Sequence, residues 1–191
     1  FLKHAKKASP VYLSANLGTD QVLPYLLKDC RGVKVALIGL TGQAASLKSE
    51  DLAVTAPDSI GQLVERLRRE GAQAVLLLST QGEKEDLKLL SKIKGIDVIF
   101  IGYNPQDQAP LDKVDGVFLA RPAWQGRRLG KLTLKIKEGK VVDCAVEELF
   151  LADTLSDDPD IKAILPECFS DLNCKRQGLT GICRKPGALN S

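Results

Sequence analysis

Three short and almost wholly apolar runs constrain the fold of this chain more than any other feature: VKVALIGLT, AVLLLS and IDVIFI, at residues 33–41, 74–79 and 96–101. Strands this apolar are typical of parallel sheets, which are covered on both faces. Between the runs, apolar residues recur at three- and four-residue spacing, which predicts one helix capped by Asp58 and terminated by Gly71, and another from about Glu83 to Lys94 that Gly95 terminates. Their expected inward residues are Ile60, Leu63, Val64 and Leu67, then Leu87, Leu90 and Ile93. This alternation predicts parallel βαβ units with right-handed crossovers.

Antiparallel pairing is expected around this unit. YLLKDC (25–30) precedes the first apolar run across Arg31-Gly32, which predicts a hairpin. From residue 117 onward the apolar residues alternate with period two, and Glu138-Gly139-Lys140 predicts a tight turn. Cys144 should then point inward together with Val142 and Val146. The fold class is therefore α/β, a mixed sheet with parallel units followed by antiparallel strands, divided into an α/β part (1–155) and a short helix with a cysteine-rich tail (156–191).

Composition narrows the classes of partner. The net charge is +3, with 44% hydrophobic and 27% charged residues, typical of a globular protein and too weakly basic to indicate nucleic acid as a partner. No apolar run approaches the roughly 20 residues that span a bilayer. The chain begins at Phe1 and contains no methionine. We therefore expect a processed chain or a piece of a longer one.

The C-terminal tail is polar and carries three cysteines, and it has too few apolar residues to fold by burial alone. Disulfides commonly stabilise such a segment. The spacing of these cysteines matches neither common zinc sites nor haem attachment. We expect at least one disulfide here and a periplasmic or extracellular location. The disulfide candidates are Cys168, Cys174 and Cys183.

Small polar turns follow the three apolar runs, and ligands of open α/β sheets bind beyond the carboxyl ends of such strands. The turns contain no Asp, Glu, His, Lys or Cys, so acid–base catalysis and firm metal binding are not expected there. The sequence accordingly predicts no catalytic residue, no metal ligand and no cofactor. The candidate ligand-binding residues are Thr41, Gln43, Thr80, Gln81, Tyr103 and Asn104.

Five segments in order, VYLSANL, YLLKDCRGVKVALIGLTG, DSIGQLVERLRREGAQAVLLLSTQG, GIDVIFIGYNP and QGRRLGKLTLKI, carry a family resemblance over residues 5–155. They resemble the second half of the catalytic domain of 5′-nucleotidase-type (calcineurin-like) metallophosphoesterases. The resemblance implies half of an αββα sandwich. In that family, LSHLG and GGHSH turns supply histidines to a dinuclear metal centre. Here Thr80, Tyr103 and Pro105 stand at the three histidine positions.

Three hypotheses follow. In the first, the chain is a non-catalytic metallophosphoesterase-like module of the cell envelope that acts by binding or as a scaffold. Its partner would be a missing N-terminal half or another chain, lying across an exposed sheet face. In the second, it is part of an active metal-dependent phosphoesterase or nucleotidase whose remaining ligands lie upstream of Phe1. In the third, it is an unrelated α/β module that binds a small molecule.

Overall fold

The computed structural model describes residues 11–42, 54–55, 57–102, 108–123, 126–152, 155–156 and 158–160. The chain divides into two compact units, residues 1–151 and 152–191. Nearly all described residues belong to the first unit. The three tail cysteines and most of the short helix expected after residue 156 lie outside the described residues.

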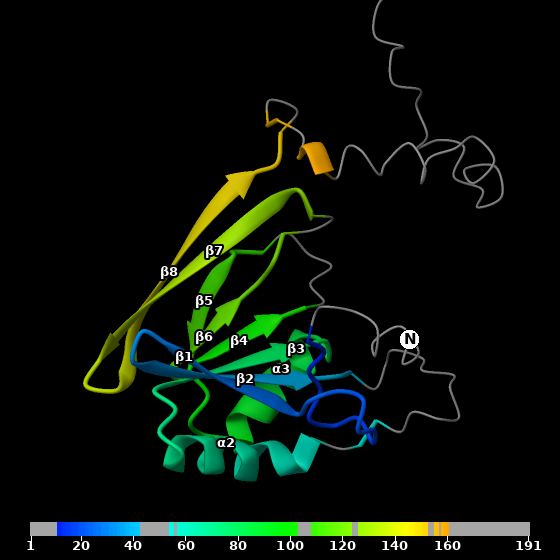
Figure 1. Ribbon diagram of the computed structural model, residues 1–191, viewed down its shortest axis with the longest axis vertical. Helices are drawn as coiled ribbons and strands as arrows, with labels where there is room; N and C mark the ends of the chain where they lie inside the picture. Colours follow the sequence, from blue (N-terminus) through cyan, green and yellow to red (C-terminus); the bar gives the residue numbers. More distant parts are fainter. Residues whose placement is uncertain are drawn as a thin grey trace, which may run out of the picture. The chain divides into compact units, whose positions relative to one another are not determined.

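The first unit is built on a six-stranded sheet with strand order β1-β2-β3-β4-β6-β5 (Figure 1). Its strands are β1 (Tyr25–Cys30), β2 (Val33–Leu40), β3 (Ala74–Ser79), β4 (Val98–Ile101), β5 (Leu111–Val114) and β6 (Val117–Ala120). The central strands β2, β3, β4 and β6 run parallel, and the edge strands β1 and β5 pair antiparallel. The predicted mixed sheet and the β1–β2 hairpin are therefore confirmed.

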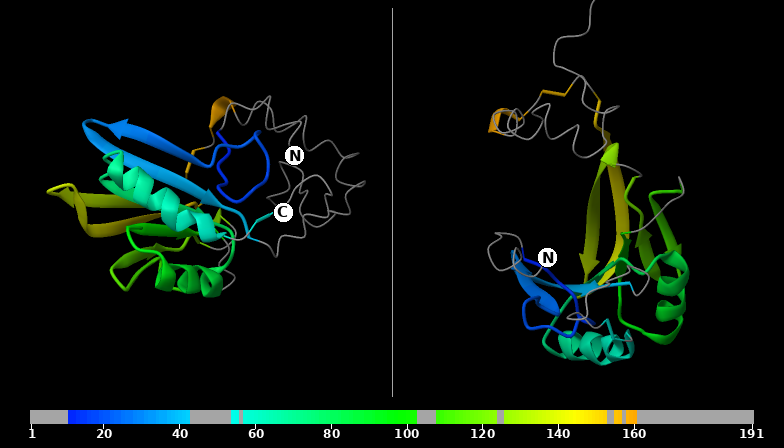
Figure 2. Two further views of the ribbon diagram at one scale, coloured as in Figure 1. Left: turned by 90° about the horizontal axis from the view of Figure 1, so that it is seen from below. Right: turned by 90° about the vertical axis from the view of Figure 1, so that its right-hand side faces the viewer.

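Two helices, α2 (Ile60–Arg69) and α3 (Glu83–Lys92), cover one face of this sheet (Figures 1 and 2). A single 3₁₀ turn at Pro57–Ser59 leads into α2. The buried residues of α2 fall at the predicted spacing, and they pack with alternate residues of the strands into the larger apolar core. Burial of this core is the main stabilisation of the fold. Its fully buried members include Ile38, Leu77, Ile99, Ile101 and Leu119.

The opposite face of the sheet packs against a long hairpin, β7 (Arg128–Lys137) and β8 (Lys140–Phe150). The turn at Glu138–Gly139 is the predicted one, and both residues have positive φ angles. Leu132, Leu134 and Ile136 of β7 face the sheet from one strand, and Cys144 faces it from the other. Cys144 is 8% exposed, so its predicted inward position is confirmed.

Two local predictions were wrong, those for Val142 and for the strand that begins at Val117, and one strand was missed. Val142 is 46% exposed, because a β-bulge shifts the register so that Ile136 pairs with Val141 and the inward position moves by one residue. In α3 the expected inward residues are confirmed, since Leu90 and Ile93 are buried and Leu87 packs against the core while partly buried; Asp86 and Leu89 are buried as well. The edge strand β5 was not predicted, and β6, which was expected in the antiparallel part, pairs parallel with β4 and antiparallel only with β5.

Candidate functional site

The carboxyl ends of β2, β3 and β4 meet at one edge of the sheet, as the parallel pairing requires. The Gly42 backbone N–H donates to Thr80 Oγ1 (3.1 Å), and the Gly102 N–H donates to the Ser79 carbonyl (2.6 Å). The approach is so close that a Cβ at Gly42 would lie 2.4 Å from the Thr80 carbonyl oxygen. Only glycine fits between these turns.

Of the six predicted ligand-binding residues, the structure describes three, Thr41, Thr80 and Gln81, and brings them together at this edge. Gln43, Tyr103 and Asn104 lie outside the described residues, as does Pro105. The Thr80 hydroxyl donates to the Leu40 carbonyl (3.4 Å) while accepting from the Gly42 backbone. It is therefore already used in holding two strand ends together.

Asn16, which is 1% exposed, fixes the turn after β2. The Thr41 N–H donates to Asn16 Oδ1 (2.8 Å), and Asn16 Nδ2 donates to the Thr41 carbonyl (2.8 Å) and more weakly to the Thr55 carbonyl (3.3 Å). The hydroxyls of Ser14 and Thr41 lie 2.7 Å apart and share a hydrogen bond. Both polar atoms of the Asn16 side chain therefore have hydrogen-bond partners within the protein, and Asn16 holds the backbone of this edge in place.

A carboxyl group reaches the edge from α3, and sequence reasoning missed it. Ser79 Oγ–H donates to Asp86 Oδ1 (2.6 Å), and Gln81 Nε2 donates to the same oxygen (3.3 Å). Asp86 is 1% exposed, and its Oδ2 atom has no hydrogen-bond partner. The expectation that no titratable group lies at this edge is therefore wrong.

Burial raises the pKa of Asp86 from its ordinary value of 3.8 to about 6. The hydrogen bonds from Ser79 and Gln81 favour the charged form and oppose this shift, while the nearby charges of Glu83 and Glu85 add to it. A carboxyl group with such a pKa exchanges a proton near neutral pH. The signal in the sequence was a polar residue on the apolar stripe of α3, in line with Leu89, Leu90 and Ile93.

A buried cation also follows the fourth parallel strand, β6. Arg121 is 7% exposed, and its guanidinium binds Glu83 through two hydrogen bonds, from Nη2 (2.6 Å) and from Nε (3.0 Å). It also donates to the Ala109 carbonyl (3.1 Å) and lies 3.6 Å from Asp112. The pairing with Glu83 raises the pKa of Arg121. The positive charge is thus neutralised inside the protein.

The described part of the chain contains no cluster of side chains suited to bind a metal ion. No group of three or more His, Cys, Asp or Glu residues stands close enough there to hold a metal ion. Asp86 and Glu83 both reach the edge, but Asp86 accepts a hydrogen bond from Ser79 and Glu83 accepts one from Arg121. Nor is any described helix long and apolar enough to cross a membrane.

No protein-family model matches the chain. It is 27% identical to the trifunctional nucleotide phosphoesterase YfkN of Bacillus subtilis (strain 168) over 155 residues, covering 74% of this chain and 10% of that protein. The sulfate thiohydrolase SoxB of Thermus thermophilus has a similar structure, with a TM-score of 0.78 and 25% identity over 86% of this chain and 33% of that one. The 5′-nucleotidase precursor of Thermus thermophilus matches with a TM-score of 0.73 and 22% identity over 93% of this chain and 40% of that one.

These matches support a relation to the 5′-nucleotidase-type metallophosphoesterases, and the mixed α/β fold corresponds to part of their structures. The chain spans a tenth of the curated relative and a third to two fifths of the two solved structures. The matches weigh against an unrelated α/β module.

Proposed function

We propose that this chain is a non-catalytic, metallophosphoesterase-like module that acts by binding or as a scaffold in the cell envelope. The observation that carries the proposal is the state of Thr80, which stands where the family resemblance puts a metal-ligating histidine. Its hydroxyl is tied between the Gly42 N–H and the Leu40 carbonyl. A neutral hydroxyl held in this way does not replace imidazole as a ligand for transition metals.

The partner expected for such a module is a further protein body, either the remainder of a metallophosphoesterase-like domain or another chain. Leu78 lies in the middle of the central strand β3, between Gly39 and Phe100, yet it is 37% exposed on the side of the sheet that the hairpin covers only in part. Central parallel strands are normally buried on both faces. Leu129 and Leu149 pair directly across the hairpin and are 61% and 53% exposed.

The hairpin itself is incomplete as a sheet. In the part of the chain that the structure describes, neither β7 nor β8 has a further strand beside it. An isolated two-stranded ribbon is marginally stable and gains from additional strands. Open strand edges and exposed apolar residues on the same layer support docking of another body there.

A second candidate function is part of an active phosphoesterase, with metal ligands contributed by sequence upstream of Phe1. The match to an enzyme named as a trifunctional nucleotide phosphoesterase favours it. Under this alternative, divalent metal ions are the cofactor. Asp86, with its pKa of about 6, is the one described group at the edge that could move a proton.

Hydrolysis of nucleotides and of a phosphodiester by the purified chain, with manganese, zinc or magnesium, tests the proposal. We expect no turnover above a heat-denatured control, and elemental analysis should find no stoichiometric transition metal. Turnover that Asp86→Asn abolishes, while Lys88→Gln leaves it intact, would overturn the proposal and establish the enzyme alternative. Analytical ultracentrifugation tests the docking proposal. We expect self-association or partner binding to weaken in Leu78→Glu. A wild-type chain that stays monomeric and binds no partner would contradict the docking proposal.

A further inference from the structure

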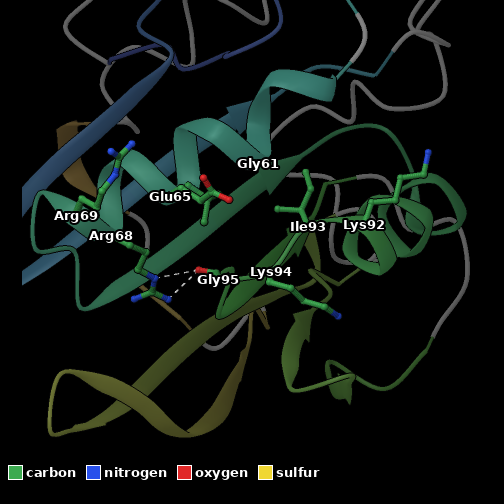
Figure 3. Close-up of a pocket in the computed structure, with 9 residues that line it drawn as sticks. Gly61, Glu65, Arg68, Arg69, Lys92, Ile93, Lys94 and Gly95 are labelled. Carbon is green, nitrogen blue, oxygen red and sulfur yellow. Dashed lines mark hydrogen bonds between the residues drawn. The ribbon is translucent and has the colours of Figure 1, made fainter.

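Two carboxyl groups lie where a helix meets the sheet, at opposite ends of the strands, and they have very different partners. At the amino ends, Asp97 Oδ2 accepts from the Arg68 guanidinium of α2 (2.6 Å) and from the Val75 N–H (2.7 Å). Arg68 also donates to the Gly95 carbonyl (2.8 and 3.1 Å), as Figure 3 shows. The charge of the Asp97 carboxylate is therefore balanced by a cation that is itself held in place.

Asp86, at the carboxyl ends, has no such partner. Its Oδ1 atom accepts from two neutral donors, the Ser79 hydroxyl (2.6 Å) and Gln81 Nε2 (3.3 Å), while the buried Oδ2 atom has no hydrogen-bond partner. In the described part of the chain no cation forms an ion pair with it, and the charges that act on it are the carboxylates of Glu83 and Glu85 on its own helix. An ionised Asp86 is thus buried beside like charges with one oxygen unpaired, which is unfavourable.

The neighbouring strands do not supply the missing charge. β3 contributes the neutral hydroxyl of Ser79. Arg121, which follows β6, binds Glu83 through two hydrogen bonds (2.6 and 3.0 Å) and lies 3.6 Å from Asp112 of β5. Its guanidinium would have to leave two carboxylates to balance Asp86. A proton is therefore the available means of neutralising Asp86 in its buried position.

The backbone beside Asp86 has the features of a hinge. α3 starts after Gly82, whose φ of 93° and ψ of 148° favour glycine, and no side chain caps the helix. Two side-chain links hold the first turn of the helix instead, Glu83 to Arg121 and Asp86 to Ser79. Of these two links, the one through Asp86 lacks a cation. The start of α3 therefore depends on whether Asp86 carries a charge.

The turn that Asp86 holds is connected to the turns on either side of it. The Gln81 N–H donates to Ser79 Oγ (3.2 Å), and the Gly42 N–H donates to Thr80 Oγ1 (3.1 Å). The Gly102 N–H donates to the Ser79 carbonyl (2.6 Å). Residues 79–81 thus join the ends of β2, β3 and β4, so a movement of this turn reaches the whole carboxyl edge.

From this geometry we infer that the turn between β3 and α3 is a pH-dependent latch of the carboxyl edge. With a proton on Asp86 the latch is closed. Ionisation favours an open form in which the carboxylate meets water, Gln81 is released and Gly42 separates from Thr80. Because the pKa of Asp86 is about 6 here and 3.8 ordinarily, closing is fully favoured below about pH 4 and weakens as pH rises to about 6. The latch needs no metal and no ligand, so it is independent of the proposed function.

Amide hydrogen exchange of the isotope-labelled chain, followed by NMR, tests the inference. In the open form Asp86 regains an ordinary pKa, so the opening constant should rise about 25-fold from pH 4.5 to 7.5. The amides of Gln81 and Gly42 should show this rise. They should also exchange faster than the amide of Leu77 in the centre of β3, and low urea should accelerate exchange at Leu77 alone, because only Leu77 requires global unfolding. Exchange of Gln81 and Gly42 with the rate and urea dependence of Leu77 would overturn the latch.

Three variants separate the titration of Asp86 from a loss of structure. Asp86→Asn cannot ionise and keeps an oxygen for the Ser79 hydroxyl, so its opening constant should not rise with pH. Gln81→Met removes a donor that favours the charged form, so the rise should level off at a higher pH than the wild-type value of about 6. Glu85→Gln, at an exposed neighbour, should leave the rise similar in size. A rise that persists in Asp86→Asn, or one that levels off at an unchanged pH in Gln81→Met, would refute the latch.

Discussion

Replacement of Asp86 by asparagine should change how stability depends on pH. The pKa of this carboxyl is about 6 in the folded protein against an ordinary value of 3.8. The folded state therefore holds the proton more tightly than the unfolded state, and the stabilisation is fully present below about pH 4 and lost as pH rises to about 6. One pKa unit corresponds to about 1.4 kcal/mol, so the full loss is about 3 kcal/mol. Between pH 4.5 and 7.5 it amounts to about 2 kcal/mol.

Urea unfolding of the wild type and Asp86→Asn at several pH values, followed by circular dichroism, measures this directly. Asparagine also alters the hydrogen bond from Ser79 and places a new donor near the unpartnered Oδ2 position, but these costs are independent of pH. The change of the stability difference with pH isolates the titration. We expect Asp86→Asn to gain about 2 kcal/mol on the wild type when the pH rises from 4.5 to 7.5.

Glu85→Gln is the matched control, because Glu85 lies next to Asp86 on α3 but is exposed. Its bond to Lys88 lowers the pKa of Glu85, so its contribution to stability is lost as pH falls, in the opposite direction. A stability difference between the wild type and Asp86→Asn that stays constant from pH 4.5 to 7.5 would refute the reasoning. It would mean that water reaches the carboxyl and keeps its pKa ordinary.

Three further predictions concern the backbone and the tail. Gly61→Ala should raise the free energy of unfolding by about 0.5 kcal/mol, because alanine restricts the unfolded chain and its methyl group fits 3.7 Å from Ile93. A lower free energy of unfolding in urea would contradict this. Gly42→Ala should lower it by about 1–3 kcal/mol, because its Cβ would lie 2.4 Å from the Thr80 carbonyl oxygen; an unchanged midpoint would mean that the turns separate without cost. Mass mapping without reduction should find at least one disulfide in the C-terminal tail, and full alkylation of its thiols would disprove it. The cysteines concerned are Cys168, Cys174 and Cys183.

The sheet could be predicted from the sequence because its central strands are continuous apolar runs and its helices have a regular apolar face. The buried positions of β3 follow the apolar run except at Leu78, and those of α2 follow the helical spacing except at Leu63, which is partly buried. The convergence of Thr41, Thr80 and Gln81 also follows from parallel pairing alone, since the carboxyl ends of parallel strands lie at one edge. Their use in internal hydrogen bonds could not be predicted, because it depends on distances of a few tenths of an ångström.

The charged groups at that edge could not be placed by considering the turns alone. Asp86 comes from the first turn of α3, and Arg121 comes from the end of β6, so each reaches the edge from an element beyond the three turns. Similarly, the exposure of Val142 depends on a bulge in β8, which shifts the period-two pattern by one position. Local periodicity assigns a residue to a face only while the register is regular.

Arg121 raises the question of whether the carboxyl edge could itself bind a phosphate group, since it supplies the cation that the turns lack. An anion would have to compete with Glu83, which holds the guanidinium at 2.6 and 3.0 Å. Separating a buried pair leaves an unpaired charge and costs about 3–5 kcal/mol. The released Glu83 carboxylate would also remain near Asp86, whose pKa it already raises. An entering dianion would therefore meet two carboxyl groups for one cation, so we expect no phosphate binding at this edge.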